Sequence, residues 1–172
     1  MSDKALEIAA QLMALSATTA PKSRGENFVF TKIIEGGRVK EIAESMERFG
    51  QKSKKANFDR DAASVRNSGV ILLIGIRDAT PISQNCGACG YDMCSELSKR
   101  EGPEFSGPHC AFRLLDMGIA LGSAVKTASI LNVDNRIMYR IGAAARDMGI
   151  VDWDFVMGIP LSGTGKNVHF DR

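Results

Sequence analysis

The feature that most constrains the fold of this chain is the spacing of its cysteines. The chain has 172 residues and four cysteines, and all four cysteines fall within residues 86–110. Their spacing is Cys86-x2-Cys89-x4-Cys94-x15-Cys110. Four thiols in so short a stretch form disulfides, hold a zinc ion or hold an iron–sulfur cluster. Each alternative requires a different spacing of the cysteines and a different conformation of the residues between them.

The N-terminal residues bear on the disulfide alternative. This stretch is rich in small residues, as secretory signals are near their cleavage site. However, Asp3 and Glu7 stand where a signal has basic residues, and Gln11 interrupts the apolar run. We therefore expect a helix of the folded protein here, and a cytoplasmic location. In that reducing compartment, clustered cysteines are more often metal ligands or catalytic groups than disulfides.

The spacing and the intervening residues distinguish the two metal alternatives. Structural zinc sites usually show two C-x2-C pairs, and here only Cys86 and Cys89 form one. A cubane 4Fe–4S cluster needs a ligand loop that wraps around it and a fourth thiolate from further along the chain. Gly87 and Gly90 directly follow two cysteines, and glycine adopts positive φ at low cost. The pattern favours one 4Fe–4S cluster and leaves a zinc-stapled structural domain as an alternative.

The pattern C-G-x-C-G-Y-x-x-C, followed by Cys110, resembles a known iron–sulfur domain. It is similar to the compact 4Fe–4S domain of the B subunits of ion-pumping electron-transport complexes and of acetyl-CoA decarbonylase/synthase subunits. The resemblance implies a single 4Fe–4S cluster held by Cys86, Cys89, Cys94 and Cys110. One departure is Ala111 after the last cysteine, where those domains often have proline.

Hydrophobic periodicity indicates mixed helices and strands along the rest of the chain. Helices are expected over 3–17, 39–49, 58–67, 114–133 and 134–149, with the second ending near Gly50 and Asp134 capping the last. Strands are expected over 28–36, 69–77 and 153–161, and the Val, Ile and Leu run of 69–77 is typical of a strand covered on both faces. The order predicts one α+β domain over 1–172, with a cluster-binding segment at 79–112 inserted in it.

Two longer stretches resemble the nitroreductase fold. Residues 9–34 look like its helix, Ala-Pro loop and strand, and residues 116–161 look like its central helix, next helix and final strand. The whole chain is similar to uncharacterised bacterial and archaeal proteins that contain a ferredoxin domain. The resemblance implies a nitroreductase-like three-layer fold in which an iron–sulfur loop is inserted before the central helix.

The nitroreductase resemblance also implies a homodimer that holds FMN at its interface. Gly118 and Gly122 give the central helix a small-residue face that suits close pairing of helices. The family's Arg-Ser-x-Arg segment, which holds the flavin phosphate, does not occur in this sequence. Arg24 and Lys166 are the candidate replacements as FMN phosphate ligands. An FMN-dependent oxidoreductase fed by the cluster is therefore the second functional hypothesis.

Composition excludes several other classes of function. The net charge is only +2 and aromatic residues make up 6% of the chain, so neither a basic patch nor a stacking platform for nucleic acid is indicated. The sequence has no apolar run long enough to span a membrane. The first hypothesis is thus an electron-transfer protein that exchanges single electrons with a redox partner protein; whether it is itself an oxidoreductase enzyme is left open.

Overall fold

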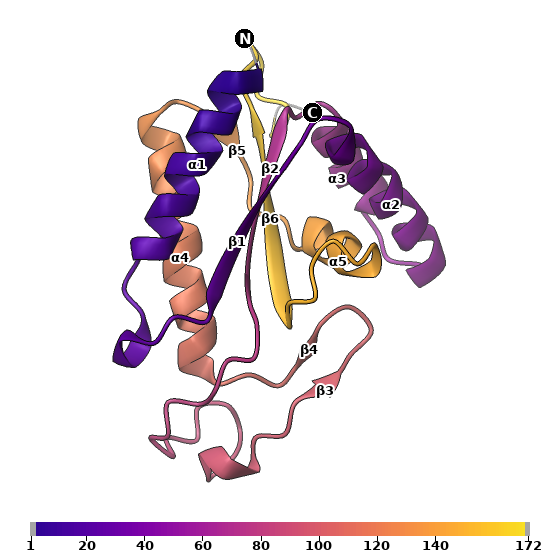
Figure 1. Cartoon of the computed structure of the whole chain (residues 1–172). Coiled ribbons are helices and arrows are strands. Elements are labelled where there is room, and N and C mark those ends of the chain that lie inside the picture. The colour runs from indigo at the N-terminus through magenta and orange to yellow at the C-terminus, as the bar shows by residue number, and fades with distance from the viewer. Residues whose placement is uncertain (1–2, 171–172) are drawn as a thin grey trace.

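The computed structural model describes residues 3–170 and is an α+β fold, as predicted (Figure 1). No helix within these residues has the length and apolar content that a membrane crossing requires. In chain order the elements are α1 (Asp3–Thr19), η1 (Ser23–Gly25), β1 (Val29–Glu35), α2 (Gly37–Ser53), α3 (Phe58–Arg66), β2 (Val70–Ile76), η2 (Cys94–Glu96), β3 (Arg100–Glu101), β4 (Ser106–Gly107), α4 (Ala111–Ile130), β5 (Asp134–Asn135), α5 (Tyr139–Asp147) and β6 (Phe155–Ser162).

An antiparallel sheet with strand order β1-β2-β6-β5 forms the middle layer. Helices α1 and α4 cover one face, and α2, α3 and α5 lie on the other (Figure 1). Every residue of β2 is buried, which confirms that this strand is covered on both faces. Side chains of a strand alternate between faces, so Ile71 and Leu73 pack with α2, α3 and α5, whereas Leu72 and Ile74 pack with α1 and α4.

The structure corrects the expected start of the last helix. Residues 134–149 do not form one helix with Asp134 as its cap, because α5 begins only at Tyr139. Asp134 and Asn135 instead form β5, which pairs with Ser162 and Leu161 of β6. Backbone pairing with the sheet therefore takes precedence over the helical periodicity of this stretch.

Two other helix boundaries also differ from those expected. Gly50 does not end α2, which continues to Ser53. A Cβ at Gly50 would lie 2.5 Å from the Cβ of Phe58, so this glycine permits close packing of α2 against α3. Helix α4 begins at Ala111, directly after Cys110 and earlier than the expected residue 114.

The cysteine segment, residues 79–110, connects the end of β2 to the start of α4 (Figure 1). It extends beyond one end of the sheet and contains η2 and the two-stranded ribbon of β3 and β4. The chain enters this segment from a buried strand and leaves it into a 20-residue helix. Both ends of the segment are therefore held by the core.

Candidate functional site

The four cysteines lie in the cysteine segment as free thiols. Cys86 is exposed, Cys89 and Cys94 are half-buried, and Cys110 is only 4% exposed at the N-cap of α4. Cys86 and Cys89 lie on an irregular loop, Cys94 is the first residue of η2, and Cys110 comes from the far end of the segment. The side of the site that carries Cys86 is therefore more open to solvent than the side that carries Cys110.

Backbone turns and one asparagine shape the loop. Gly87 and Gly90 have φ values of 71° and 88°, and the N–H of Gly90 donates to the carbonyl of Gly87 over 2.9 Å. Asn85 binds Cys94 twice: its N–H donates to Sγ over 3.3 Å, and its Oδ1 accepts from the Cys94 N–H over 2.9 Å. Asn85 itself has φ 48°, a conformation that asparagine tolerates better than most residues. These contacts bring the two ends of the Cys86–Cys94 stretch together.

The thiols do not form a closed coordination shell. Within residues 3–170, no three His, Cys, Asp or Glu side chains lie close enough together to hold a metal ion. What fits a metal group is the chemistry of the donor set. It consists of four free thiols in one segment, with the last at the N-terminus of a long helix. Cys110 therefore lies at the end of the helix where backbone N–H groups have no acceptor within the helix.

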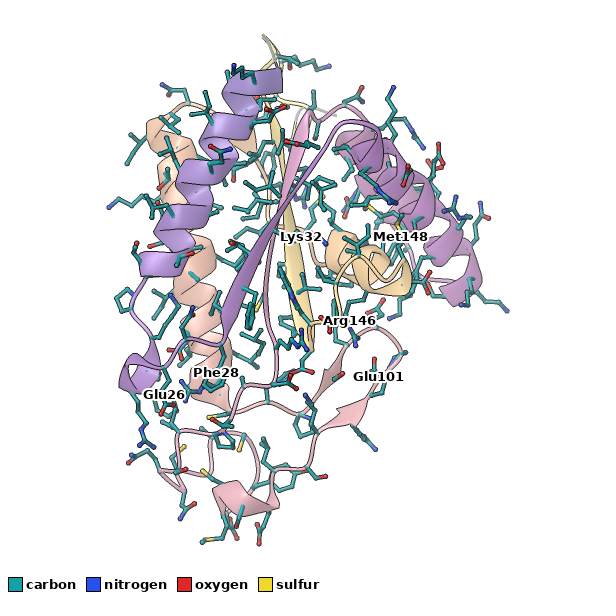
Figure 2. All side chains as sticks on the ribbon, viewed as in Figure 1. Glu26, Phe28, Lys32, Glu101, Arg146 and Met148 are labelled. Atoms are coloured by element: carbon teal, nitrogen blue, oxygen red, sulfur yellow. The ribbon has the colours of Figure 1, made fainter. Side chains whose placement is uncertain are left out.

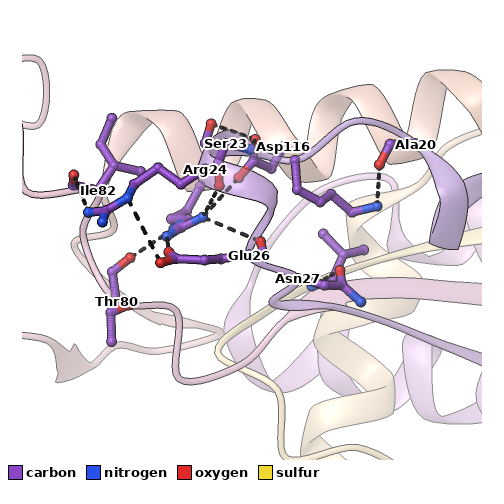
Figure 3. Close-up of polar contacts among 11 residues, drawn as sticks. Ala20, Ser23, Arg24, Glu26, Asn27, Thr80, Ile82 and Asp116 are labelled. Atoms are coloured by element: carbon purple, nitrogen blue, oxygen red, sulfur yellow. Dashed lines mark hydrogen bonds and ion pairs between the residues drawn. The ribbon is translucent and has the colours of Figure 1, made fainter.

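A fully buried arginine, Arg113, lies one turn after Cys110 and was not identified from the sequence. Its Nε donates to the carbonyl of Thr80 over 2.8 Å, and its Nη1 donates to the carbonyl of Ser23 over 3.0 Å (Figure 3). Its guanidinium also pairs with the carboxylates of Glu26 and Asp116. These bonds join three segments: the loop after α1, the beginning of the cysteine segment and the start of α4.

A second group of ion pairs holds the β3–β4 ribbon to the sheet and to α5. The Nζ of Lys99 lies 2.7 Å from Asp154 Oδ1, and the N–H of Asp78 donates to Asp154 Oδ2 over 2.7 Å. The hydrogen bond to Asp154 raises the pKa of Lys99. A hydrogen bond from Lys99 lowers the pKa of Asp78. The Nη2 of Arg146 on α5 lies 2.8 Å from Oε1 of Glu101 on β3, and the two labelled side chains point toward one another in Figure 2.

The structure does not bring the two candidate flavin-phosphate ligands together. Arg24 precedes β1, and its Nη1 donates to the carbonyl of Ile82 over 3.1 Å (Figure 3). Lys166 follows the end of β6 and is exposed. Both β1 and β6 pair antiparallel with β2, so they start at the same end of the sheet. Arg24 precedes the start of β1 and Lys166 follows the end of β6, so the two cations lie at opposite ends of the sheet. Arg24 lies on the side of the cysteine segment, and Lys166 lies away from it.

Comparisons with known proteins identify the sequence family. The family model described as "Uncharacterized protein containing a ferredoxin domain" (DUF2148) matches residues 106–172, a range that includes Cys110 but not the other three cysteines. An "Uncharacterized protein" from Archaeoglobus fulgidus is 50% identical over 172 residues, which are 99% of this chain and 93% of the relative.

Solved structures share the fold at low sequence identity. A putative nitroreductase in complex with FMN from Desulfovibrio desulfuricans matches with a TM-score of 0.61 and 14% identity, over 97% of this chain and 77% of that one. A nitroreductase with bound FMN from Desulfitobacterium hafniense matches with a TM-score of 0.59 and 13% identity, over 93% of this chain and 79% of that one. A BluB-like flavoprotein from Clostridium difficile matches with a TM-score of 0.54 and 14% identity, over 98% of this chain and 87% of that one.

These structural matches support a nitroreductase-like fold, and the full-length match to the archaeal relative supports a common family. The chain therefore belongs to the family of uncharacterised proteins that contain a ferredoxin domain.

Proposed function

We propose that this protein is an iron–sulfur redox protein that holds one 4Fe–4S cluster through Cys86, Cys89, Cys94 and Cys110. The observation that carries the proposal is the placement of four free thiols in one segment, with buried Cys110 at the N-terminus of α4. The membership in a ferredoxin-domain family supports it. A bound cluster would supply one-electron transfer.

The chain's own residues have distinct tasks in this proposal. Cys110 supplies a thiolate from a rigid position, because it caps a 20-residue helix that Arg113 fastens to two neighbouring segments. Asn85 orients Cys94, and its backbone N–H is the kind of donor that stabilises thiolate sulfur. The exposure of Cys86 gives a redox partner protein access to this end of the molecule.

Purification without oxygen, in a reducing buffer as befits a proposed cytoplasmic protein, tests the assignment. We expect a brown protein with equal iron and sulfide contents, and broad visible absorption that dithionite bleaches. A colourless protein with one zinc ion per chain would contradict the proposal and establish the zinc-stapled structural domain instead.

An FMN-dependent oxidoreductase fed by the cluster is a second candidate, and the shared fold of the FMN-containing structures favours it. Arg24 and Lys166, proposed as phosphate ligands, lie at opposite ends of the sheet, so they would have to act on different flavins or through a second subunit. We expect heat extraction of the anaerobic protein to release a yellow flavin if this function holds. An absence of flavin, together with no binding of added FMN, would exclude it.

We also propose that two copies pair through an apolar face on α1 and α4. On α4, Leu115 and Ile119 are 60% and 48% exposed, and a Cβ added at Gly118 or Gly122 would meet no atom within 4 Å. Helix α1 adds three exposed apolar side chains at helical spacing, Ile8, Leu12 and Leu15. Exposed apolar side chains on two helices that pack against each other are the kind of surface that a protein interface covers.

A further inference from the structure

Within the cysteine segment, a cavity of about 750 Å³ opens between the stretch that contains Tyr91 and the β3–β4 ribbon. Its volume falls within the range of about 300–1,000 Å³ that small-molecule sites occupy. Apolar rings and polar groups both line it, and the principal residues are Tyr91, Ser98, Arg100, Phe105, Ser106 and Pro108.

One wall of this cavity is fixed before any ligand binds. The ring of Phe105 packs edge-on against Phe155 of β6, with 4.7 Å between the ring centroids. The N–H of Ser106 donates to the carbonyl of Asp154 over 2.9 Å, and the N–H of Gly102 closes the ribbon turn on Phe105 over 2.9 Å. The ribbon is therefore a rigid platform that presents an aromatic ring.

The charge of the cavity comes from Arg100. Among the described residues, its guanidinium has no hydrogen-bond or ion-pair partner. Its neighbour Glu101 instead pairs with Arg146 (Figure 2). The carboxylate of Glu101 also accepts a hydrogen bond from the hydroxyl of Ser106. Consecutive strand residues point to opposite faces, so the pairing of Glu101 with α5 leaves Arg100 on the other face of the ribbon. No carboxylate is among the cavity-lining residues in the described chain.

A second cavity, of about 380 Å³ and also bordered by the ribbon, shows the opposite charge pattern. Its lining includes four carboxylates, and its arginine, Arg146, is already paired with Glu101. The two cavities thus differ in the sign of the ligand they favour. The lining of the Arg100 cavity therefore suits an anion, and the lining of the Arg146 cavity does not.

We propose that the cavity lined by Arg100 binds a planar aromatic carboxylate. The guanidinium of Arg100 would engage the carboxylate in a bidentate pair, and the ring of the ligand would lie against Tyr91 and Phe105. A single guanidinium matches the single charge of a carboxylate better than the double charge of a phosphate.

The position of this site is notable because its walls belong to the cysteine segment. Tyr91 lies between Cys89 and Cys94, and Pro108 lies two residues before Cys110. A ligand bound here would lie beside the proposed cluster ligands. An effect of this ligand on electron exchange depends on the proposed iron–sulfur function. The binding itself does not depend on that function.

Calorimetric titration of the full-length, anaerobically purified protein with 2-naphthoate tests the proposal. We expect saturable binding of one 2-naphthoate per chain, about tenfold weaker binding of neutral 2-naphthalenemethanol and no binding of acetate, since both the charge and the ring contribute. Tighter binding of 2-naphthyl phosphate than of 2-naphthoate would overturn the choice of carboxylate.

Variants locate the bound anion. Arg100→Gln should weaken 2-naphthoate binding to the level of the neutral ring, whereas Arg38→Gln, an exposed arginine on α2, should leave it unchanged. The thermal unfolding midpoint of each variant establishes that it is folded. No saturable binding, or equal binding by wild type and Arg100→Gln, would overturn the proposal. Iron and sulfide contents of the same samples report separately on the proposed function.

Discussion

Cys110 is the residue on which the proposed cluster depends most, because it is the buried thiol and it is the N-cap of α4. We expect Cys110→Ser to yield a three-iron form or to lose the cluster, since one corner iron loses its thiolate. Serine is itself a favourable N-cap, so the start of α4 should persist. Iron and sulfide analysis with electron paramagnetic resonance measures the outcome. Ser95→Ala, in the same segment, is the control and should keep all its iron; full iron and an unchanged spectrum in Cys110→Ser would refute the ligand assignment.

Arg113 should contribute more to the free energy of unfolding than an exposed arginine does. Arg113→Met leaves the buried carboxylate of Asp116 without its cation and the carbonyls of Thr80 and Ser23 without a donor. We expect a loss of about 3 kcal/mol in the free energy of unfolding, measured by urea denaturation. Arg38→Met removes an exposed ion pair with Glu41 and should cost less than about 1 kcal/mol. Equal losses in the two variants would show that burial of Arg113 has no energetic consequence.

The importance of Arg113 could not be predicted from periodicity alone. The sequence does carry a signal, because Arg113 and Asp116 interrupt an otherwise apolar helix at i, i+3 spacing. That spacing predicts a pair on one helix face, but not the partners Ser23 and Thr80, which lie 90 and 33 residues away in the chain. The cysteine ligand set, in contrast, follows from the spacing and from the resemblance to a 4Fe–4S domain. It stays a prediction, because no three possible ligands within residues 3–170 lie close enough together to hold a metal ion.

At the scale of the elements, α5 illustrates what limits sequence-based prediction. The long apolar patterns of α1, β1 and β2 were located to within a few residues, since their periodicity and their burial agree. The stretch 134–138 has helical periodicity, but Met138 forms a bridge with Gly158, and this pairing delays the helix. Contacts with a strand about twenty residues further along are not encoded in a local pattern.

The packing of α5 on β6 gives a prediction at this scale. A Cβ at Gly142 would lie 1.9 Å from the carbonyl oxygen of Val156, a backbone atom that cannot rotate away. We expect Gly142→Ala to lower the free energy of unfolding by about 3 kcal/mol. Gly37→Ala, at the first residue of α2 where an added methyl meets no atom within 4 Å, should stay within about 0.5 kcal/mol of wild type. Urea denaturation compares the two variants, and a tolerated Gly142→Ala would contradict the close approach of the α5 and β6 backbones at Gly142.

The attachment of the ribbon should depend on pH through Asp78. The hydrogen bond from Lys99 holds the pKa of Asp78 below its usual value. The stabilisation is therefore present above the unfolded-state pKa of about 4 and is lost as the pH falls through the lower folded-state pKa. We expect Asp78→Asn to be slightly less stable than wild type at pH 7, with a difference that vanishes in strong acid; the effect is small because Asp78 is exposed. Urea midpoints over a pH series measure this, with Glu35→Gln as an exposed control. A difference that persists in strong acid would assign the effect to something other than the carboxylate charge.

For the molecule as a whole, the class of fold followed from the order of helices and strands, but the strand order did not. The sheet places β6, the last strand, between β2 and β5, and no local signal specifies that neighbour. The sequence also presented the small residues of α4 as a helix-pairing face. In the structure, Gly118 and Gly122 face open space rather than α1. The same helix contacts α1 through other residues, such as Thr127, whose hydroxyl lies 2.6 Å from that of Ser16.

The open apolar face leads to the prediction for the whole molecule. If two copies pair through α1 and α4, an arginine at Ile119 would place a charge in a desolvated interface, and each partner of a stable dimer buries about 800 Å² there. We expect wild type to sediment as a dimer and Ile119→Arg as a folded monomer. Ile137→Arg replaces a side chain of similar exposure, 40% against 48%, outside both helices, and should remain dimeric. A monomeric wild type across the concentration series, or a dimeric Ile119→Arg, would exclude this face. In either case the apolar side chains would remain exposed to solvent or to another partner.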